Sequence, residues 1–157
     1  MPSDEHWMRL AIEKATEGVA VGQTPFGACV VRGGEAVTVA HNVVLRDTDI
    51  TAHAEVTAIR EACRALGTID LGGCVIYSTC EPCPMCFSAC HWANLDRIVY
   101  GASIADAARC GFRELSISNE QMKRLGRSGV GIKAGLLRDE ALELFAEWMR
   151  QPGRRTY

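Results

Sequence analysis

"CVIYSTCEPCPMCFSACHW", residues 74–92, joins an apolar run to four closely spaced cysteines. Its first part, Cys74–Thr79, has the continuous apolar character of a strand that is buried on both faces of a sheet. Cys83–Trp92 is predicted to be a helix, and "RIVYGA", residues 97–102, is a second buried strand. This strand–helix–strand order predicts a parallel pair with a right-handed connection, the core of an α/β domain.

The rest of the chain extends this pattern on both sides and suggests one domain over residues 1–157. A hairpin turning at Gly33-Gly34 is expected to add two antiparallel strands, which gives a three-layer α/β/α fold with a mixed five-stranded sheet. Thr51 is expected to cap one of the helices and Gly67 to end it. The predicted elements are helix 3–18, strands 27–31 and 36–41, helix 51–66, short helices 105–110 and 119–125, a strand within 130–135 and helix 138–150.

Composition narrows the classes of partner. The formal net charge of −2 over 157 residues gives no general attraction to nucleic acid or anionic membranes. No apolar run approaches the roughly 20 residues of a membrane span, and the first ten residues lack a signal-peptide core. We therefore expect a cytoplasmic protein whose eight cysteines are reduced. The isolated ones, Cys29, Cys63, Cys74 and Cys110, are expected in the core.

Two of the clustered cysteines have the spacing of metal ligands. If Cys83 is the N-cap of its helix, Pro84 occupies the first helical position, where its missing N–H costs nothing. Cys86 then lies on the same helical face as Cys83. The partial positive charge of a helix N-terminus favours both thiolates. Cys80 and Cys90 are expected to pack beside the site rather than to bind the metal.

"TAHAEVTAI", residues 51–59, supplies the remaining chemistry. His53 is the candidate third ligand, and three protein ligands leave one zinc position open, as in catalytic sites. One Zn²⁺ per chain would lower the pKa of a water molecule toward about 7. Glu55 is the candidate that accepts the proton and returns it to a leaving nitrogen. The combination of H-x-E with P-C-x-x-C is the signature of zinc deaminases.

Two non-enzymatic interpretations remain open. The run C-x2-C-x2-C-x3-C has the spacing of a bacterial iron–sulfur motif, although His91 follows the last cysteine where proline is usual and no second run exists. A purely structural zinc, with Glu55 incidental, is the other. Zinc content and visible absorbance would separate these interpretations from an enzyme.

The segments "TPFGACVV", "HNVV", "TAHAEVTAIR", "YSTCEPCPMC" and "DAARCGF" resemble, in order and spacing, those of the cytidine deaminase superfamily. The resemblance is greatest to bacterial zinc-dependent guanine deaminases, and it implies hydrolysis of guanine to xanthine and ammonia. It implies that Phe26 and Trp92 flank the base, that Asn42 and the backbone N–H of Ala54 bind it, and that Glu114 is a second catalytic carboxylate. Each of these side chains could instead be structural or solvated.

The resemblance also implies a homodimer in which a C-terminal segment, about 136–157, is exchanged so that Tyr157 closes the partner's site. Arg113 beside Glu114 departs from the family pattern, in which acids stand at both positions. Cytosine or another aminated ring remains an alternative substrate. A tRNA adenosine deaminase is a further alternative, although a terminal tyrosine would obstruct a polymer and nucleic acid is not the expected partner.

Overall fold

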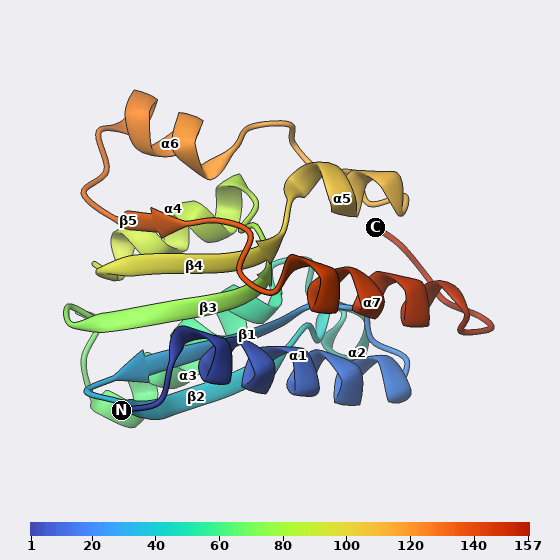
Figure 1. The fold of residues 1–157 in the computed structure, drawn as a ribbon, viewed down its shortest axis with the longest axis horizontal. Helices are drawn as coiled ribbons and strands as arrows, with labels where there is room; N and C mark the ends of the chain where they lie inside the picture. The colour runs from blue at the N-terminus through green and yellow to red at the C-terminus, as the bar shows by residue number, and fades with distance from the viewer.

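The computed structural model describes all 157 residues as one α/β unit (Figure 1). All six expected helices and all five expected strands are present, with small differences at their ends, and a short helix, α2, is additional. The elements are α1 (Asp4–Ala20), β1 (Gly27–Arg32), β2 (Glu35–His41), α2 (Val44–Asp47), α3 (Ala54–Leu66), β3 (Cys74–Cys80), α4 (Pro84–Trp92), β4 (Arg97–Ala102), α5 (Ile104–Arg109), α6 (Asn119–Gly126), β5 (Gly131–Lys133) and α7 (Arg138–Met149).

The sheet confirms the mixed five-stranded prediction, with one difference in topology. Its order is β2-β1-β3-β4-β5, in which β1 runs antiparallel to both neighbours while β3, β4 and β5 are parallel. The connection from β2 through α3 to β3 therefore does not create a parallel pair, because β1 lies between the two strands. The Gly33-Gly34 turn, with φ of 59° and 80°, holds β1 beside β2 and leaves its other edge for β3.

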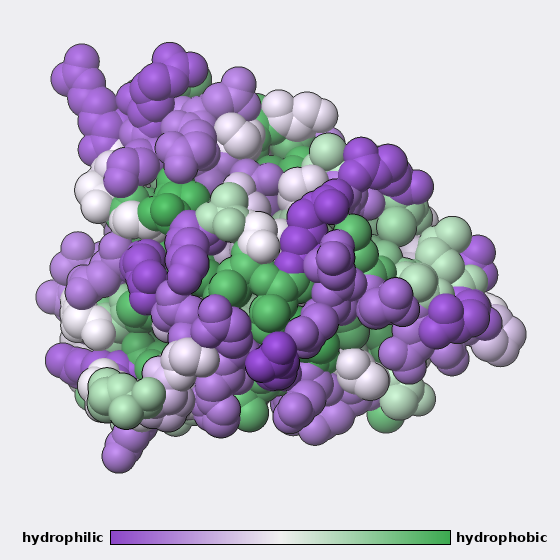
Figure 2. Space-filling view, in the orientation of Figure 1, coloured by the Kyte–Doolittle hydropathy of each residue, from purple (hydrophilic) through white to green (hydrophobic).

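Helices cover both faces of the sheet, as the three-layer prediction requires. Side chains of β1 alternate between the two resulting cores. Cys29 and Val31 pack with Trp7 and Met8 of α1 on one face, whereas Val30 packs against α3 and α4 on the other face. On the face drawn in Figure 2, hydrophilic residues cover most of the surface and hydrophobic atoms appear mainly between them.

A charged cluster anchors the start of α1 to the sheet. Ser3 caps this helix by accepting a hydrogen bond from the backbone N–H of His6. Next to it, the carboxylate of Asp4 accepts hydrogen bonds from Tyr77 of β3 at 2.7 Å, Arg97 of β4 at 3.0 Å and Lys133 of β5 at 2.8 Å. Burial opposes ionisation of Asp4, but these three donors outweigh it and lower its pKa to about 2.

The beginning of α3 corrects the predicted cap. The hydroxyl of Thr51 bonds Asp49 at 2.7 Å within the preceding turn, so Thr51 does not cap the helix. His53 is the N-cap instead, in an extended conformation, and α3 begins at Ala54. The other end is as predicted, since Gly67 ends α3 with a φ of 65°. The first helix continues two residues past Gly18, which is buried against the ring of His41.

The topology gathers several loops at one edge of the sheet. Cys80 and Ala102 end the parallel strands β3 and β4 at this edge. Because β1 runs in the opposite direction, its first residue Gly27 lies at the same edge, opposite His41 at the end of β2. In α/β folds the carboxyl ends of parallel strands carry the functional site. No helix in the structure combines the length and apolar character that crossing a membrane requires.

Candidate active site

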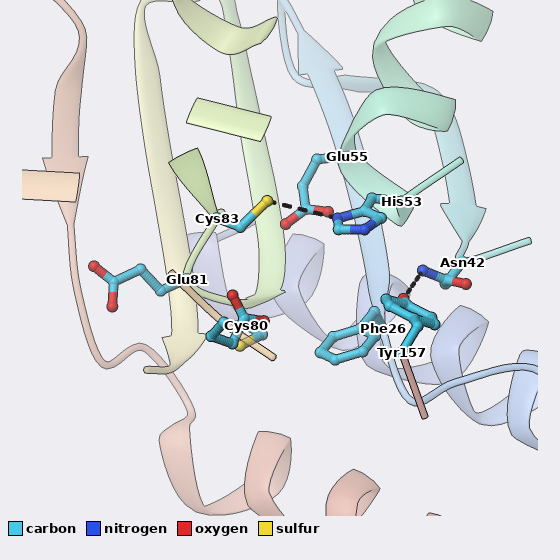
Figure 3. Close-up of a pocket in the computed structure, with 9 residues that line it drawn as sticks. Phe26, Asn42, His53, Glu55, Cys80, Glu81, Cys83 and Tyr157 are labelled. Atoms are coloured by element: carbon cyan, nitrogen blue, oxygen red, sulfur yellow. Dashed lines mark hydrogen bonds between the residues drawn. The ribbon is translucent and has the colours of Figure 1, made fainter. Parts of the chain in front are cut away.

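The three predicted ligands, His53, Cys83 and Cys86, meet at this edge, and Figure 3 shows His53 facing Cys83. The Nδ1 atom of His53 lies 3.6 Å from Sγ of Cys83 and 3.4 Å from Sγ of Cys86. Zn–S bonds of about 2.3 Å and Zn–N bonds of about 2.0 Å, at tetrahedral angles, separate sulfur from nitrogen by about 3.5 Å. The three atoms therefore fit one tetrahedral zinc ion. A histidine nitrogen and two cysteine sulfurs, rather than four sulfurs, form the cluster, which disfavours the iron–sulfur interpretation.

His53 lies at the start of α3, and Cys83 and Cys86 lie at the start of α4. Cys83 is the N-cap of α4, Pro84 follows in the first turn, and neither Cys83 nor His53 makes a side-chain capping hydrogen bond. A hydrogen bond from Cys86, assisted by His53, lowers the pKa of the Cys83 thiol to about 4. Burial alone would lower the pKa of His53, but its hydrogen bond with Cys83 and the nearby Glu55 raise it. The site thus favours a thiolate at Cys83, the form that binds metal.

Glu55 lies beside the triad as the second residue of α3. It is only 6 % exposed, and this burial raises the pKa of its carboxyl group. Its Oε1 atom lies 3.1 Å from the hydroxyl of Ser78, which also lies 2.6 Å from the carbonyl oxygen of Cys80. The hydroxyl has one proton. It can donate to ionised Glu55, or donate to Cys80 and accept from protonated Glu55. Both protonation states of Glu55 are therefore accommodated.

A small inner cavity adjoins the ligands. Its volume is about 20 Å³, close to the space that one water molecule occupies. It shares four lining residues with an outer chamber of about 290 Å³ at the surface. The inner cavity brings together predicted site residues from six separate segments of the sequence. Its lining is Phe26, Asn42, His53, Glu55, Cys80, Glu81, Cys83, Glu114 and Tyr157.

Asn42 presents a hydrogen-bond donor to the cavity. Its side-chain oxygen accepts from the backbone N–H of Val44 at 3.0 Å, at the start of α2. This bond fixes the amide so that its NH₂ group points the other way, where it donates to the hydroxyl of Tyr157 at 2.6 Å. Asn42 is 1 % exposed and well held. The short helix α2, which the sequence did not predict, thus orients this amide.

Phe26 and Glu114 form other walls. Phe26 packs edge-to-face on Phe112 at 4.9 Å and on Phe145 at 5.8 Å between ring centroids. Glu114 is half-buried rather than solvated, and burial, with the nearby Cys83 and Glu55, raises its pKa to about 7. The neighbouring Arg113 is exposed and lines only the outer chamber.

Trp92 lies elsewhere, which corrects the sequence prediction. It is the last residue of α4, whereas Cys83 precedes the first residue of the same helix. Nine helical residues separate these ends by about 13 Å. The indole is 83 % exposed and lines a different surface groove, with Phe87, His91 and Met122. Within the chain it cannot flank a base beside the ligands. Ala54, in contrast, is the first residue of α3 between His53 and Glu55, where helix N–H groups have no helical partner.

The C-terminal tail reaches the cavity of its own chain. The backbone N–H of Arg113 donates to the carbonyl oxygen of Tyr157 at 3.1 Å, and the Tyr157 hydroxyl lies 3.3 Å from that of Thr24. The Tyr157 ring packs near His53, with 5.7 Å between centroids. In Figure 1 the chain returns from α7 to end beneath α5. Exchange of residues 136–157 between two subunits stays a prediction.

Sequence reasoning missed three polar residues around the site. Ser78 supports Glu55, Thr24 supports Tyr157, and Glu81 connects β3 to the ligand Cys83. A polar pair at the end of an otherwise apolar strand, Ser78-Thr79, was a detectable signal, as was the lone acid between two cysteines. Thr24 gave no local signal, because its partner is 133 residues away.

Comparisons with known proteins agree with this geometry. Residues 1–102 match the family described as the cytidine and deoxycytidylate deaminase zinc-binding region. The chain is 44% identical to the guanine deaminase of Bacillus subtilis over 117 residues, 74% of this chain and 75% of that protein. It is 42% identical to the tRNA-specific adenosine deaminase of the same organism over 102 residues, 65% of this chain and 63% of that one. A structure of guanine deaminase from Nitrosomonas europaea superposes with a TM-score of 0.86 at 30% identity, over 94% of this chain and 85% of that one.

Proposed function

The chain belongs to the cytidine and deoxycytidylate deaminase family, and its relatives include deaminases of more than one substrate. On this premise we propose that it converts guanine and water to xanthine and ammonia. The similarity to guanine deaminases from two bacteria supports this choice of substrate. The hydrolytic chemistry follows from the family, whereas the assignment to guanine rests on the walls of the inner cavity.

His53, Cys83 and Cys86 would hold one zinc ion, which, when bound, lowers the pKa of water and polarises the reacting ring. Glu55 is positioned to carry the proton that the attacking water loses and to deliver it to the leaving amino nitrogen. Its burial favours this exchange, because a raised pKa brings a carboxyl group closer to neutral pH. Ser78 supports both protonation states of Glu55, as its single hydroxyl proton has a second acceptor.

The remaining side chains would bind the base. Asn42 offers an N–H donor that suits an acceptor on a purine edge, such as a ring nitrogen or a carbonyl oxygen. Phe26 offers an apolar ring held by two further aromatic rings. Glu114 provides a half-buried carboxyl group that can accept from the amino or ring N–H groups of guanine.

The observation that carries the proposal is the closure of the inner cavity by Tyr157. The hydroxyl of Tyr157 occupies the Asn42 amide, and about 20 Å³ of space remains. The base can enter only if this side chain moves, and the tail that bears it is anchored by few hydrogen bonds. A compact free base fits a site that closes in this way better than a nucleotide within a polymer.

Ammonia release from a substrate panel tests the proposal. The panel contains guanine, cytosine, cytidine, adenine, guanosine, ammeline and a tRNA anticodon stem-loop, with the Glu55→Gln variant as the blank. We expect turnover of guanine that the variant lacks. Turnover of another compound with guanine unreacted would overturn the guanine assignment and leave the family chemistry intact.

A tRNA adenosine deaminase is the second candidate, favoured by the 42% identity to the Bacillus subtilis enzyme. Its substrate must present a flipped base with its backbone still attached. Such binding should weaken steeply with salt, because cations released from the phosphates contribute to affinity. Anticodon stem-loop binding measured at 50 and 200 mM salt separates the two candidates.

A further inference from the structure

Glu81 is one of the residues that line the inner cavity, but its buried carboxylate is directed away from the predicted ligands. It follows β3 and precedes the Pro82–Cys83 step into α4, and its side chain is 7 % exposed. In Figure 3 the carboxylate points away from His53 and Cys83, so it is not directed at a substrate. It forms no ion pair with lysine, arginine or histidine. A buried charge without a counter-charge requires compensation by hydrogen bonds.

Backbone donors from two distant segments provide that compensation. The Oε1 atom of Glu81 accepts from the backbone N–H of Ile104 at 3.1 Å, and Oε2 accepts from the backbone N–H of Asn119 at 2.9 Å. Ile104 is the first residue of α5 and Asn119 the first residue of α6. Both N–H groups belong to first turns, where they lack helical acceptors. One carboxylate therefore holds the starts of two helices against the segment that leads to Cys83.

Asn119 holds the same segment a second time. Its side-chain NH₂ group donates to the carbonyl oxygen of Pro82 at 2.6 Å, and the residue is fully buried. The backbone N–H of Glu81 donates to the carbonyl oxygen of Ala102 at 2.7 Å. Both residues between the end of β3 and the ligand Cys83 are thus fixed by side-chain or backbone contacts from the other half of the chain.

The same contacts fix the loop that carries Glu114. This loop has no regular secondary structure between residue 112 and the start of α6, and Asn119 is its C-terminal anchor. Glu114 lies five residues before that anchor and lines the inner cavity with Cys83. We infer that Glu81 and Asn119 are positioning residues that set the Cys83 ligand and the Glu114 loop relative to each other. The part concerning Glu114 rests on the proposed function, whereas the part concerning Cys83 does not.

Glu81→Gln tests the inference directly. An amide has one acceptor oxygen, so its NH₂ group would face a backbone N–H and one of the two bonds would be lost. We expect zinc transfer to a colorimetric chelator to become about tenfold faster, the lower end of the effect of residues that orient metal ligands. The absorption bands of the cobalt-substituted protein should also change, because they report ligand geometry. Glu120→Gln, an exposed acid next to Asn119, is the matched control.

Further readouts separate positioning from stability. For guanine, kcat should fall more than KM changes in Glu81→Gln, because the Glu114 loop moves relative to the metal. Zinc transfer and cobalt spectra equal to wild type, even in a less stable variant, would overturn the inference. These two measurements need no substrate, so they remain decisive if guanine proves unreactive. If Glu81→Gln does not fold, Asn119→Ala replaces it, since it removes only the bond to Pro82; unchanged zinc transfer there would equally overturn the inference.

Discussion

Replacing Ser78 by alanine isolates the hydrogen bond that supports Glu55. The hydroxyl lies 3.1 Å from Glu55 Oε1 and 2.6 Å from the Cys80 carbonyl oxygen. The substitution removes a single hydroxyl group, leaves the backbone of β3 intact, and does not touch the metal ligands. Because Glu55 is almost fully buried, water cannot readily replace the lost donor.

The size of the expected loss of activity follows from the negative charge of the acceptor, Glu55. A hydrogen bond to a charged group contributes about 1.5–3 kcal/mol. The lower end applies here, because the bond is long and the hydroxyl proton has a shorter competing bond to Cys80. About 1.5 kcal/mol corresponds to a roughly tenfold loss of kcat/KM. The donor favours the ionised form, so its removal raises the pKa of Glu55 further. Activity that needs the carboxylate is then lost first at low pH, and the acidic limb should move upward by about one pH unit.

The assay is ammonia release from guanine between pH 5 and 9, with zinc content measured in each preparation. Ser88→Ala is the matched control, because the Ser88 hydroxyl bonds only the Pro84 carbonyl oxygen within its own helix. A Ser78→Ala enzyme that keeps its zinc, works within twofold of wild type and has an unchanged acidic limb would refute the role assigned to this bond.

Three other expectations concern stability, the corrected residue and the metal. Asp4→Asn should lower the free energy of unfolding at pH 7 by about 1–2 kcal/mol, a value reduced because Arg97 and Lys133 are partly exposed. Because the pKa of Asp4 is lowered in the folded state, the stability difference between wild type and variant, measured by denaturant titration, should vanish as the pH falls from about 4 to 2. Trp92→Ala should leave KM for guanine within about twofold, as expected for an exposed side chain outside the cavity; a tenfold increase would return it to the site. Chelation should abolish ammonia release and lower the thermal midpoint, and added zinc should restore both; activity that survives in metal-free protein would contradict the assigned ligands.

The metal site was predictable because its geometry is set locally. Pro84 and the three-residue spacing place Cys83 and Cys86 on one helix end, and His53 stands two residues before Glu55. The Gly33-Gly34 turn between two short strand-like runs likewise specifies a hairpin within a few residues. Only the contact between the start of α3 and the start of α4 is long-range. It was predictable because ligands from both helices must meet to bind one metal ion.

What could not be predicted depends on contacts between distant segments. The insertion of β1 between β2 and β3 is a choice of sheet order that no local pattern encodes. The family resemblance implied that Trp92 flanks the base, but within the chain the length of α4 carries it away from the ligands. The bonds of Glu81 to Ile104 and Asn119 span 23 and 38 residues, and only the folded chain reveals them.

The starts of α3 and α4, which lack side-chain caps, imply a conflict between function and stability. His53 and Cys83 occupy N-cap positions that aspartate or serine would fill to the advantage of α3 and α4. Each such replacement commonly contributes about 1 kcal/mol. In metal-free protein, Asp or Ser at either position should therefore raise the thermal midpoint, although the same change removes a zinc ligand and the stability that bound zinc contributes. A laboratory screen for heat resistance of metal-free chains should enrich such inactive variants unless turnover is screened as well.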